Sequence, residues 1–122
     1  MTACSPSRVG SDPSTRYDIG AAIERSDLME LGNTYATAGV AAAMEESEQF
    51  RRELAAAFAR YCRGDWGQLC REDWELNDAS LKDGSRILAA YDTSRGRIWI
   101  ITEAEGADGR RSATTFLFPE EY

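Results

Sequence analysis

Three acidic residues and a tryptophan lie close together near the middle of the chain. Asp65 and Trp66 are adjacent, and Glu72 and Asp73 follow within one short segment. Two carboxyl groups with separated pKa values can act as a general acid and a general base. In the competing structural interpretation, Asp65 caps a helix, Trp66 packs at a corner and Glu72 faces solvent. We favour the structural interpretation and keep the four residues as binding candidates, with no catalytic residue assigned.

Aromatic residues suggest a second kind of site. A flat group of aromatic rings can stack on a base or nucleotide, and the candidates for such a group are Trp66, Trp74, Tyr91, Trp99 and Tyr122. Aromatic residues at strand or helix spacing are more often part of a hydrophobic core. We therefore expect most of these rings to be buried, and keep Trp66 and Trp99 as binding candidates.

Charged residues flank a polar turn near the C-terminus. Glu103 precedes the turn, and Arg110 and Arg111 end it. These three residues can form a recognition surface, or a cross-strand ion pair worth about 0.2–1 kcal/mol. Both interpretations stay open, and the three residues complete the set of binding candidates.

The absence of histidine limits the chemistry of the whole chain. It excludes Ser-His-Asp and Cys-His catalysis and every metal site that uses histidine. The three cysteines, Cys4, Cys62 and Cys70, form no CxxC pair, so we expect free thiols in a reducing cytoplasm. The sequence thus predicts no metal site and no cofactor, and an enzyme here would depend on carboxylates, Lys82, tyrosine or cysteine.

Charge and hydropathy narrow the range of partners. The chain of 122 residues has 21 acidic and 14 basic residues, a net charge of −7. Direct binding of nucleic acid is not expected, because phosphate neutralisation needs clustered Lys and Arg. An acidic surface suits a basic protein partner, or simply aids solubility. The sequence contains no run of 18 apolar residues, so it predicts no membrane-spanning helix.

The elements expected from the pattern divide the chain at residue 28. Residues 1–28 are predicted to be a flexible or weakly helical extension, since Ser, Pro and Gly dominate its first part. Residues 29–122 are predicted to form a single domain. Its elements are a short edge strand over 31–37, helices over 38–46, 47–63 and 68–80, and strands over 86–91, 97–103 and 112–118.

Helix ends and faces follow from the same pattern. Thr37, Ser47 and Asp65 are the expected caps of the three helices. The second helix should bury Phe50, Leu54, Ala57, Phe58 and Tyr61, and the third should turn Leu69, Leu76 and either Trp74 or Asp73 inward. We therefore predict an α+β fold, with two or three short helices packed on a small antiparallel sheet. This sheet comprises a C-terminal three-strand meander and the short N-terminal edge strand.

The middle strand of the meander is apolar on both faces. Ile98 and Ile100 point to one face, and Trp99 and Ile101 to the other. An antiparallel sheet with one wet face should alternate more cleanly. Either the chain covers both faces, or one face meets a partner such as a second copy in a homodimer.

Several stretches in residues 30–122 are similar in order to a family of short proteins. The matching stretches are residues 32–40 (GNTYATAGV), 64–67 (GDWG), 86–88 (RIL), 98–104 (IWIITEA), 111–115 (RSATT) and 117–122 (LFPEEY). The chain resembles the plasmid-related proteins of bacterial, phage and plasmid genomes, which are also labelled subunit M of a type I restriction system. The resemblance implies a setting on mobile DNA and carries no established activity.

Two departures from the family pattern matter. The turn over residues 105–110 is longer here, and Tyr61 stands where the family often has histidine. The restriction label also finds no support, because a methyltransferase needs a longer chain and a cofactor-binding parallel sheet.

These observations favour a small, acidic, non-enzymatic binding protein of a mobile genetic element. In its sharper form the protein inhibits a host defence system, restriction or CRISPR, by presenting acids to a basic nucleic-acid channel. Two alternatives stay open. One is a nucleotide-binding protein or small enzyme that uses Trp66, Trp99, Glu103 and Arg111, and the other is a structural homo-oligomer.

Overall fold

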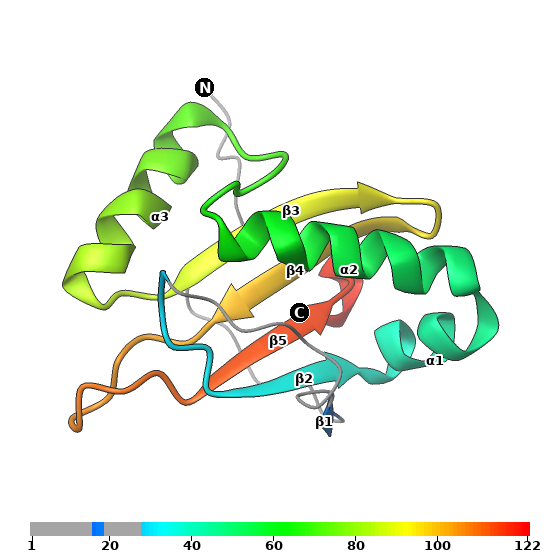
Figure 1. Cartoon of the computed structure of the whole chain (residues 1–122), viewed down its shortest axis with the longest axis horizontal. Helices are drawn as coiled ribbons and strands as arrows, with labels where there is room; N and C mark the ends of the chain where they lie inside the picture. Colours follow the sequence, from blue (N-terminus) through cyan, green and yellow to red (C-terminus); the bar gives the residue numbers. More distant parts are fainter. Residues whose placement is uncertain (1–15, 19–27) are drawn as a thin grey trace.

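The computed structural model describes residues 16–18 and 28–122, so most of the predicted N-terminal extension lies outside the described residues. The described elements are β1 (Arg16–Asp18), β2 (Asn33–Thr37), α1 (Ala38–Glu46), α2 (Glu48–Cys62), α3 (Arg71–Asp83), β3 (Ile87–Thr93), β4 (Gly96–Thr102), β5 (Ala113–Leu117) and the 3₁₀ turn η2 (Pro119–Glu121). The strands form one sheet in the order β1-β2-β5-β4-β3 (Figure 1). Helices packed on a small sheet confirm the predicted α+β fold.

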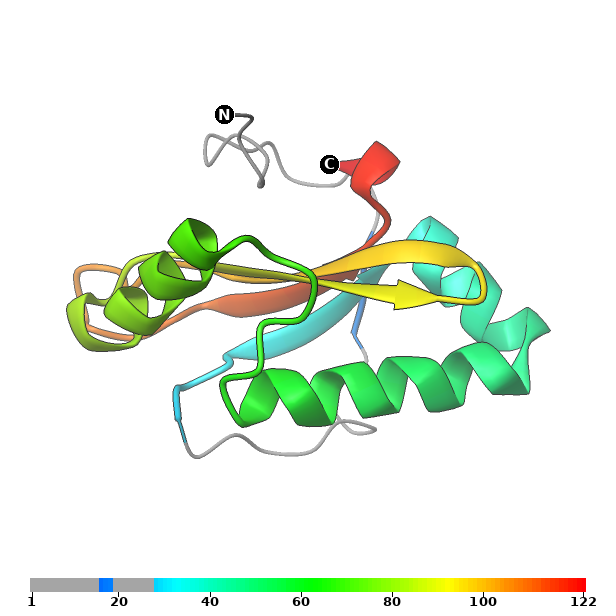
Figure 2. The ribbon, with the colours of Figure 1, turned by 90° about the horizontal axis from the view of Figure 1, so that it is seen from above.

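The predicted C-terminal meander is present. β3 pairs antiparallel with β4 from Ile87↔Thr102 to Thr93↔Gly96, and β4 pairs antiparallel with β5. The hairpin turn is tight, and Gly96 has a φ of 108°, which a side chain would disfavour. α2 lies across one face of this sheet, whereas η2 lies on the opposite face (Figure 2).

The N-terminal strand differs from its prediction in two ways. β2 pairs parallel with β5, so the sheet is mixed, and β1 pairs with the other side of β2, so β2 is not an edge strand. A parallel pair needs a long crossover between its strands. The chain between β2 and β5 includes all three helices and a hairpin, and the sequence pattern contains no information on that long-range pairing.

The N-terminus of α1 is capped from the far end of the chain. Thr37 is the N-cap residue, as predicted, but its hydroxyl donates to Glu121 instead of accepting from the helix. The Glu121 carboxylate accepts the Gly39 amide at 2.8 Å and the Phe118 amide at 3.1 Å. A carboxylate suits this position because helix N-termini have unsatisfied N–H groups and a positive dipole end.

α2 forms as predicted and supplies most of the core. The Ser47 hydroxyl accepts the Phe50 amide at 3.0 Å, and the buried residues are Phe50, Leu54, Ala57, Phe58 and Tyr61. Phe58 packs on Phe116 with ring centroids 5.3 Å apart. Ile98 and Ile100 of β4 are fully buried in the same core cluster.

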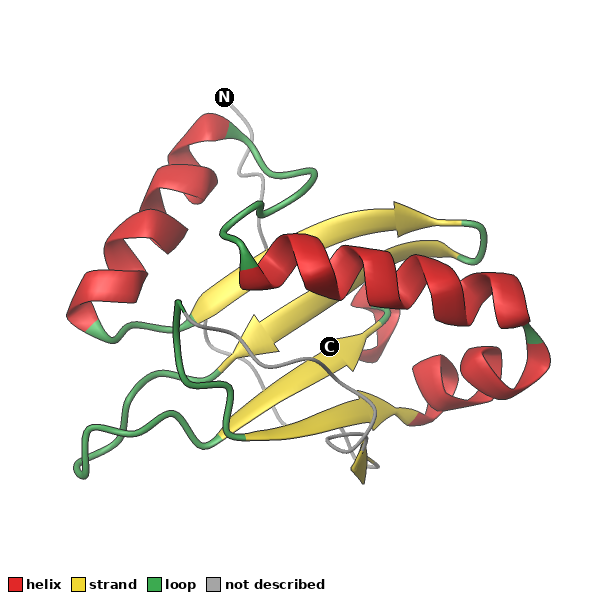
Figure 3. Cartoon of the chain, in the orientation of Figure 1, coloured by secondary structure: helices red, strands yellow, loops and turns green. Residues whose placement is uncertain are grey.

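α3 corrects two predictions. It begins at Arg71 rather than near residue 68. Its buried residues are Asp73, which was predicted to face inward as the alternative to Trp74, and the polar residues Asn77 and Ser80. Leu76, predicted to point inward, is 54% exposed. Asn77 is fully buried. The physical reason is that α3 lies beside the edge of the sheet, where the groups it must satisfy are backbone N–H and C=O (Figure 3).

Asn77 acts on the edge of β3 as a neighbouring strand would. Its amide donates to the Leu88 carbonyl at 2.7 Å, and its side-chain oxygen accepts the Leu88 amide at 3.3 Å. Farther along the same edge, the Gln68 amide donates to the Ala90 carbonyl at 2.7 Å, and the Ala90 amide donates to the Trp66 carbonyl. Chain segments thus cover part of the β3 edge, which reduces its capacity to pair with a second copy.

The second face of the middle strand is covered within the chain. Ile101 is 3% exposed and clusters with Leu88 and Leu117, against which Trp99 and Tyr122 pack. Of the two alternatives left open by the sequence, cover from the same chain is therefore the one observed at Ile101. Self-association stays a prediction.

Replacement of Asn77 by alanine tests how α3 is held. Asn77→Ala leaves the buried N–H and C=O of Leu88 without this partner, which we expect to cost about 2 kcal/mol or more in unfolding free energy. Urea denaturation followed by circular dichroism measures the change. Glu75→Ala, an exposed change on the same helix, should stay within about 0.5 kcal/mol of the wild type. Equal midpoints for the two variants would contradict this account of α3.

Candidate functional site

Asp65 and Trp66 are structural neighbours in the corner between α2 and α3. Trp66 is fully buried in the core, edge-on to Tyr61 at 5.4 Å between ring centroids, and its indole N–H donates to Asp78 at 2.9 Å. Asp65 was predicted to cap α3, but the N-cap residue of this helix is Cys70. Its carboxylate accepts two hydrogen bonds from Arg60, at 2.9 and 3.2 Å, and one from the Gly67 amide. These bonds from Arg60, with that from Gly67, hold the pKa of Asp65 below its ordinary value.

Glu72 and Asp73 lie in the first turn of α3 and face different surroundings. Glu72 is exposed, whereas Asp73 is 8% exposed, and its Oδ2 has no hydrogen-bond partner in the part of the chain that the structure describes. Both acids suit the positive end of the helix dipole. Since Asp65 is bonded to Arg60 and Glu72 extends into solvent, the structure assembles no acid–base pair from these carboxylates.

Arg110 and Arg111 are adjacent in sequence but occupy different environments. Arg110 is exposed and forms an ion pair with Glu30 at 3.0 Å. Arg111 is 4% exposed, and its guanidinium donates to the carbonyls of Ser80, Ser85 and Glu103 at 2.7–3.1 Å. A charge near the last carbonyls of α3 is favoured by the helix dipole. Arg111 therefore joins α3, the following loop and the end of β4, and its donors are directed at the protein itself.

Trp99 and Glu103 are linked by a series of contacts through Tyr122 and Arg86. Trp99 is edge-on to Tyr122 at 5.5 Å between ring centroids. The Arg86 guanidinium lies over the Tyr122 ring at 5.7 Å and donates to its hydroxyl at 3.2 Å. Glu103 approaches the Arg86 Nε to 3.9 Å. Arg86 was not among the predicted site residues, because the local sequence does not indicate its contact with Tyr122, which lies 36 residues later in the chain.

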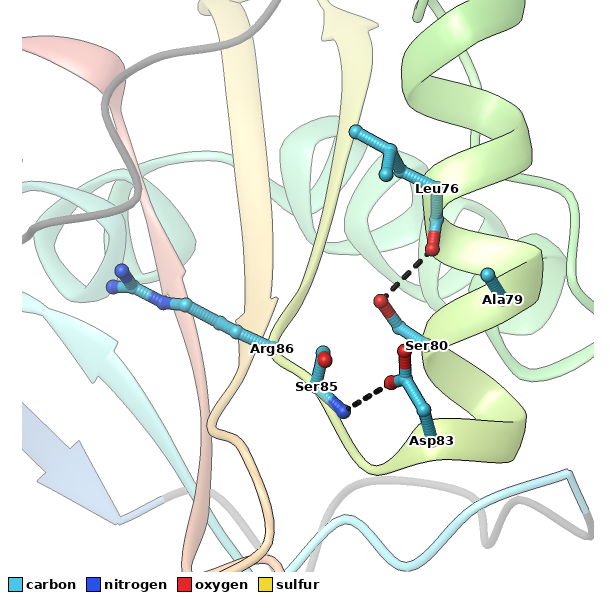
Figure 4. A pocket seen from close by; sticks show the side chains of 6 residues that line it. All are labelled: Leu76, Ala79, Ser80, Asp83, Ser85 and Arg86. Carbon is cyan, nitrogen blue, oxygen red and sulfur yellow. Dashed lines mark hydrogen bonds between the residues drawn. The ribbon is translucent and has the colours of Figure 1, made fainter.

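A pocket of about 270 Å³ opens beside this group, between α3 and the start of β3. It is lined by Leu76, Ala79, Ser80, Asp83, Ser85 and Arg86. Figure 4 shows Leu76, Ser80 and Asp83 on the pocket side of the helix, and the Arg86 side chain extending away from them across the sheet. The pocket was not predicted, because the periodicity of the helix placed Leu76 on its inner side.

Hydrogen bonds within the pocket wall fix its shape. The Ser80 hydroxyl donates to the Leu76 carbonyl at 2.8 Å, and the Ser85 amide donates to the Asp83 carboxylate at 2.8 Å (Figure 4). Hydrogen bonds from Ser85 hold the pKa of Asp83 below its ordinary value, so the residue is ionised at neutral pH. The pocket thus combines an apolar wall with a carboxylate at its rim.

Tyr61, at the C-terminal end of α2, is fully buried. Its hydroxyl shares a hydrogen bond with Thr102, and burial raises the pKa of Tyr61 well above its ordinary value. The group is therefore neutral at physiological pH and part of a polar network in the core. It does not reach the surface.

The cysteines differ from their prediction at one position. Cys70, at the N-cap of α3, is disulfide-bonded, so free thiols are wrong for this residue. Cys62 is half-buried at the end of α2, and Cys4 lies outside the described residues. Since disulfides are rare in a reducing cytoplasm, the cytoplasmic location stays a prediction.

Neither a metal-binding cluster nor a membrane-spanning helix is found among the described residues. Residues 16–18 and 28–122 hold no group of three or more Cys, Asp or Glu side chains placed to bind a metal. Within the same residues, no helix has the length and apolar character of a membrane span.

Comparison of the chain with protein-family models, curated proteins and solved structures finds no match.

The adjacent arginines provide a matched test of the structural role. Arg111→Lys leaves at least one of the three carbonyls without a donor, because a single ammonium group cannot reproduce the planar guanidinium fork, in which one nitrogen bonds Ser85 and Glu103 and the other bonds Ser80. We expect a loss of about 2 kcal/mol or more in unfolding free energy, measured by urea denaturation. Arg110→Lys should stay within about 1 kcal/mol of the wild type, since its ion pair is exposed. Tolerance of Arg111→Lys would contradict the assignment.

Acid titration tests the Asp65–Arg60 pair. A carboxyl whose folded-state pKa is lowered stabilises the fold above its unfolded-state pKa, and this contribution is lost as pH falls through the folded-state value. Unfolding free energy of the wild type should therefore decrease below about pH 4. Arg60→Gln should flatten that decrease, as measured by thermal unfolding between pH 2.5 and 6. An identical pH profile in both proteins would contradict this role of the pair.

Proposed function

We propose that this protein is a small, non-enzymatic binding protein whose acidic surface engages a basic protein partner. The observation that carries the proposal is the distribution of charge. Residues 28–122 contain 17 acidic and 11 basic side chains. Seven of those basic residues, all arginines, form ion pairs with carboxylates of the same chain. The positive charge is thus largely neutralised internally, and the acids remain in excess.

Two of the three remaining arginines are also engaged within the chain. Arg111 is buried against backbone carbonyls, and Arg51 donates to the Met44 carbonyl. These internal contacts leave few basic side chains to neutralise phosphates, which supports a protein partner over a nucleic acid. A field of one sign on a small protein favours the encounter with a partner of opposite charge.

α3 carries much of the excess. Its sequence, REDWELNDASLKD, has five acids and two basic residues. Asp73 is buried, whereas Glu72 and Glu75 are exposed on its outer surface. This helix is therefore the part of the surface that we assign to the partner.

The resemblance to plasmid-related proteins supports a setting on mobile DNA. In that setting, the partner is a nucleic-acid-handling protein of the host, and binding of acids to its basic channel inhibits restriction or CRISPR defence. The location would then be the cytoplasm.

The geometry does not favour the alternative of a nucleotide site built from Trp66, Trp99, Glu103 and Arg111. Trp66 belongs to the core cluster shared with α2, and Trp99 to the smaller cluster on the other face of the sheet. Arg111 donates to backbone carbonyls inside the protein. These groups cannot contact one ligand together.

Binding to purified restriction and CRISPR effector complexes tests the proposal. Biolayer interferometry with the full chain immobilised should detect at least one effector, with affinity falling steeply between 0.1 and 0.5 M salt because charge drives the association. The double variant Glu72→Lys, Glu75→Lys should bind at least tenfold more weakly.

Two controls accompany this assay. Bare duplex DNA should not bind, and Glu48→Lys, a single charge reversal on α2, should have a smaller effect than the double change on α3. Failure of every nucleic-acid-handling protein to bind would overturn the proposed function.

A further inference from the structure

The outer face of α3 has a regular arrangement of apolar and acidic residues. Glu72, Leu76, Ala79 and Asp83 are spaced four, three and four apart, which places them in one stripe along a helix. All four are exposed. Leu76 and Leu28 are the large hydrophobic side chains that stand out as exposed among residues 28–122. We call the four residues the α3 stripe: two apolar positions between two carboxylates.

The pocket described above opens beside the apolar part of the α3 stripe. Leu76 and Ala79 line it, and Asp83 stands at its rim. Small-molecule sites usually enclose about 300–1,000 Å³, so a volume of about 270 Å³ suits a single side chain better than a cofactor. A neighbouring protein that inserts an apolar side chain here would bury Leu76 as well.

A second copy of this chain is a poor occupant. If two α3 stripes packed antiparallel, Glu72 of each copy would face Asp83 of the other; if they packed parallel, each acid would face its own equivalent. Both arrangements bring carboxylates together, and like charges across an interface are costly. The charge pattern therefore selects a partner with positive residues at both ends of an apolar centre.

The positive groups near the pocket do not reverse this selection. The Arg86 side chain extends across the sheet toward Tyr122 and Glu103 (Figure 4). Arg111 lies behind the pocket wall, with its donors on the Ser80 and Ser85 carbonyls. Lys82 is exposed on α3 but lies about a quarter turn away from the α3 stripe at helical geometry.

We propose that the α3 stripe and its pocket bind a basic amphipathic helix of the partner protein. An apolar side chain of that helix enters the pocket against Leu76 and Ala79, and Lys or Arg residues pair with Glu72 and Asp83 at the two ends. An amphipathic helix is the natural match because apolar residues three to four positions apart fall on one face. This inference rests on the proposed function, since it names the chemistry of the partner and the place where it binds.

Defined peptides test the inference. The probe is an alanine-based helical peptide with Arg, Leu, Leu and Arg at positions i, i+4, i+7 and i+11, labelled for fluorescence anisotropy and titrated with the full chain. We expect saturable binding. The same peptide with Glu in place of both Arg residues should not bind. Absence of binding by the Arg peptide up to millimolar protein would overturn the inference.

Variants separate the α3 stripe from general acidity. Leu76→Ser should weaken binding of the Arg peptide at least tenfold, whereas Leu28→Ser, a matched change at the other exposed leucine, should leave it within twofold. Glu72→Lys should weaken the Arg peptide and strengthen a peptide that carries Glu at its matching end. Equal affinities for the wild type and Leu76→Ser, with both shown folded by circular dichroism, would overturn the inference.

The two proposals fail in different ways. If an effector complex binds the wild type and Leu76→Ser equally, the α3 stripe is not the docking site, but the proposed function stands. If the Arg peptide binds as expected and no nucleic-acid-handling protein does, the docking chemistry stands and the proposed function fails.

Discussion

The polar attachment of α3 to the edge of the sheet is the constraint on which the outer surface depends. A helix usually buries an apolar stripe, but α3 buries Asp73, Asn77 and Ser80. Asn77 bonds the buried backbone N–H and C=O of Leu88, and Arg111 donates to the Ser80 carbonyl and to two others. Trp74 and Leu81 pack partly against the core beside these hydrogen-bonding groups, and Leu76 and Ala79 are left on the outer side of the helix.

This arrangement links stability to surface chemistry. The hydrogen bonds that hold α3 also fix the walls of the adjacent pocket, since Arg111 bonds the Ser80 and Ser85 carbonyls behind it. A rigid pocket reduces the ordering cost of binding a partner. Glu75 pairs with Arg71 on the same helix, whereas the other ion-paired arginines bind carboxylates outside α3, so Glu72 and Asp83 form no ion pair with an arginine of the described residues. A weak apolar site with a strong charge preference is what these features produce together.

The C-terminal residues contribute to both faces of the sheet. Glu121 caps α1 through the Gly39 amide, which anchors η2 near the start of that helix. Tyr122 then packs on Trp99 and receives a hydrogen bond from Arg86. Tyr122 thus helps to cover the small cluster around Ile101 on one face of β4. On the other face, Ile98 and Ile100 are buried in the main core cluster.

Local pattern in the sequence was enough to determine α1, α2 with its Ser47 cap and buried face, and the meander of β3, β4 and β5, because each depends on neighbours close in the chain. It also determined the acidic charge and the lack of histidine chemistry. Only the tertiary structure decided the parallel pairing of β2 with β5, the capping of α1 by Glu121 and the outward position of Leu76. Those features depend on contacts between residues far apart in sequence, and the periodicity of α3 alone cannot show that its partner is a strand edge, which selects hydrogen-bonding side chains over apolar ones.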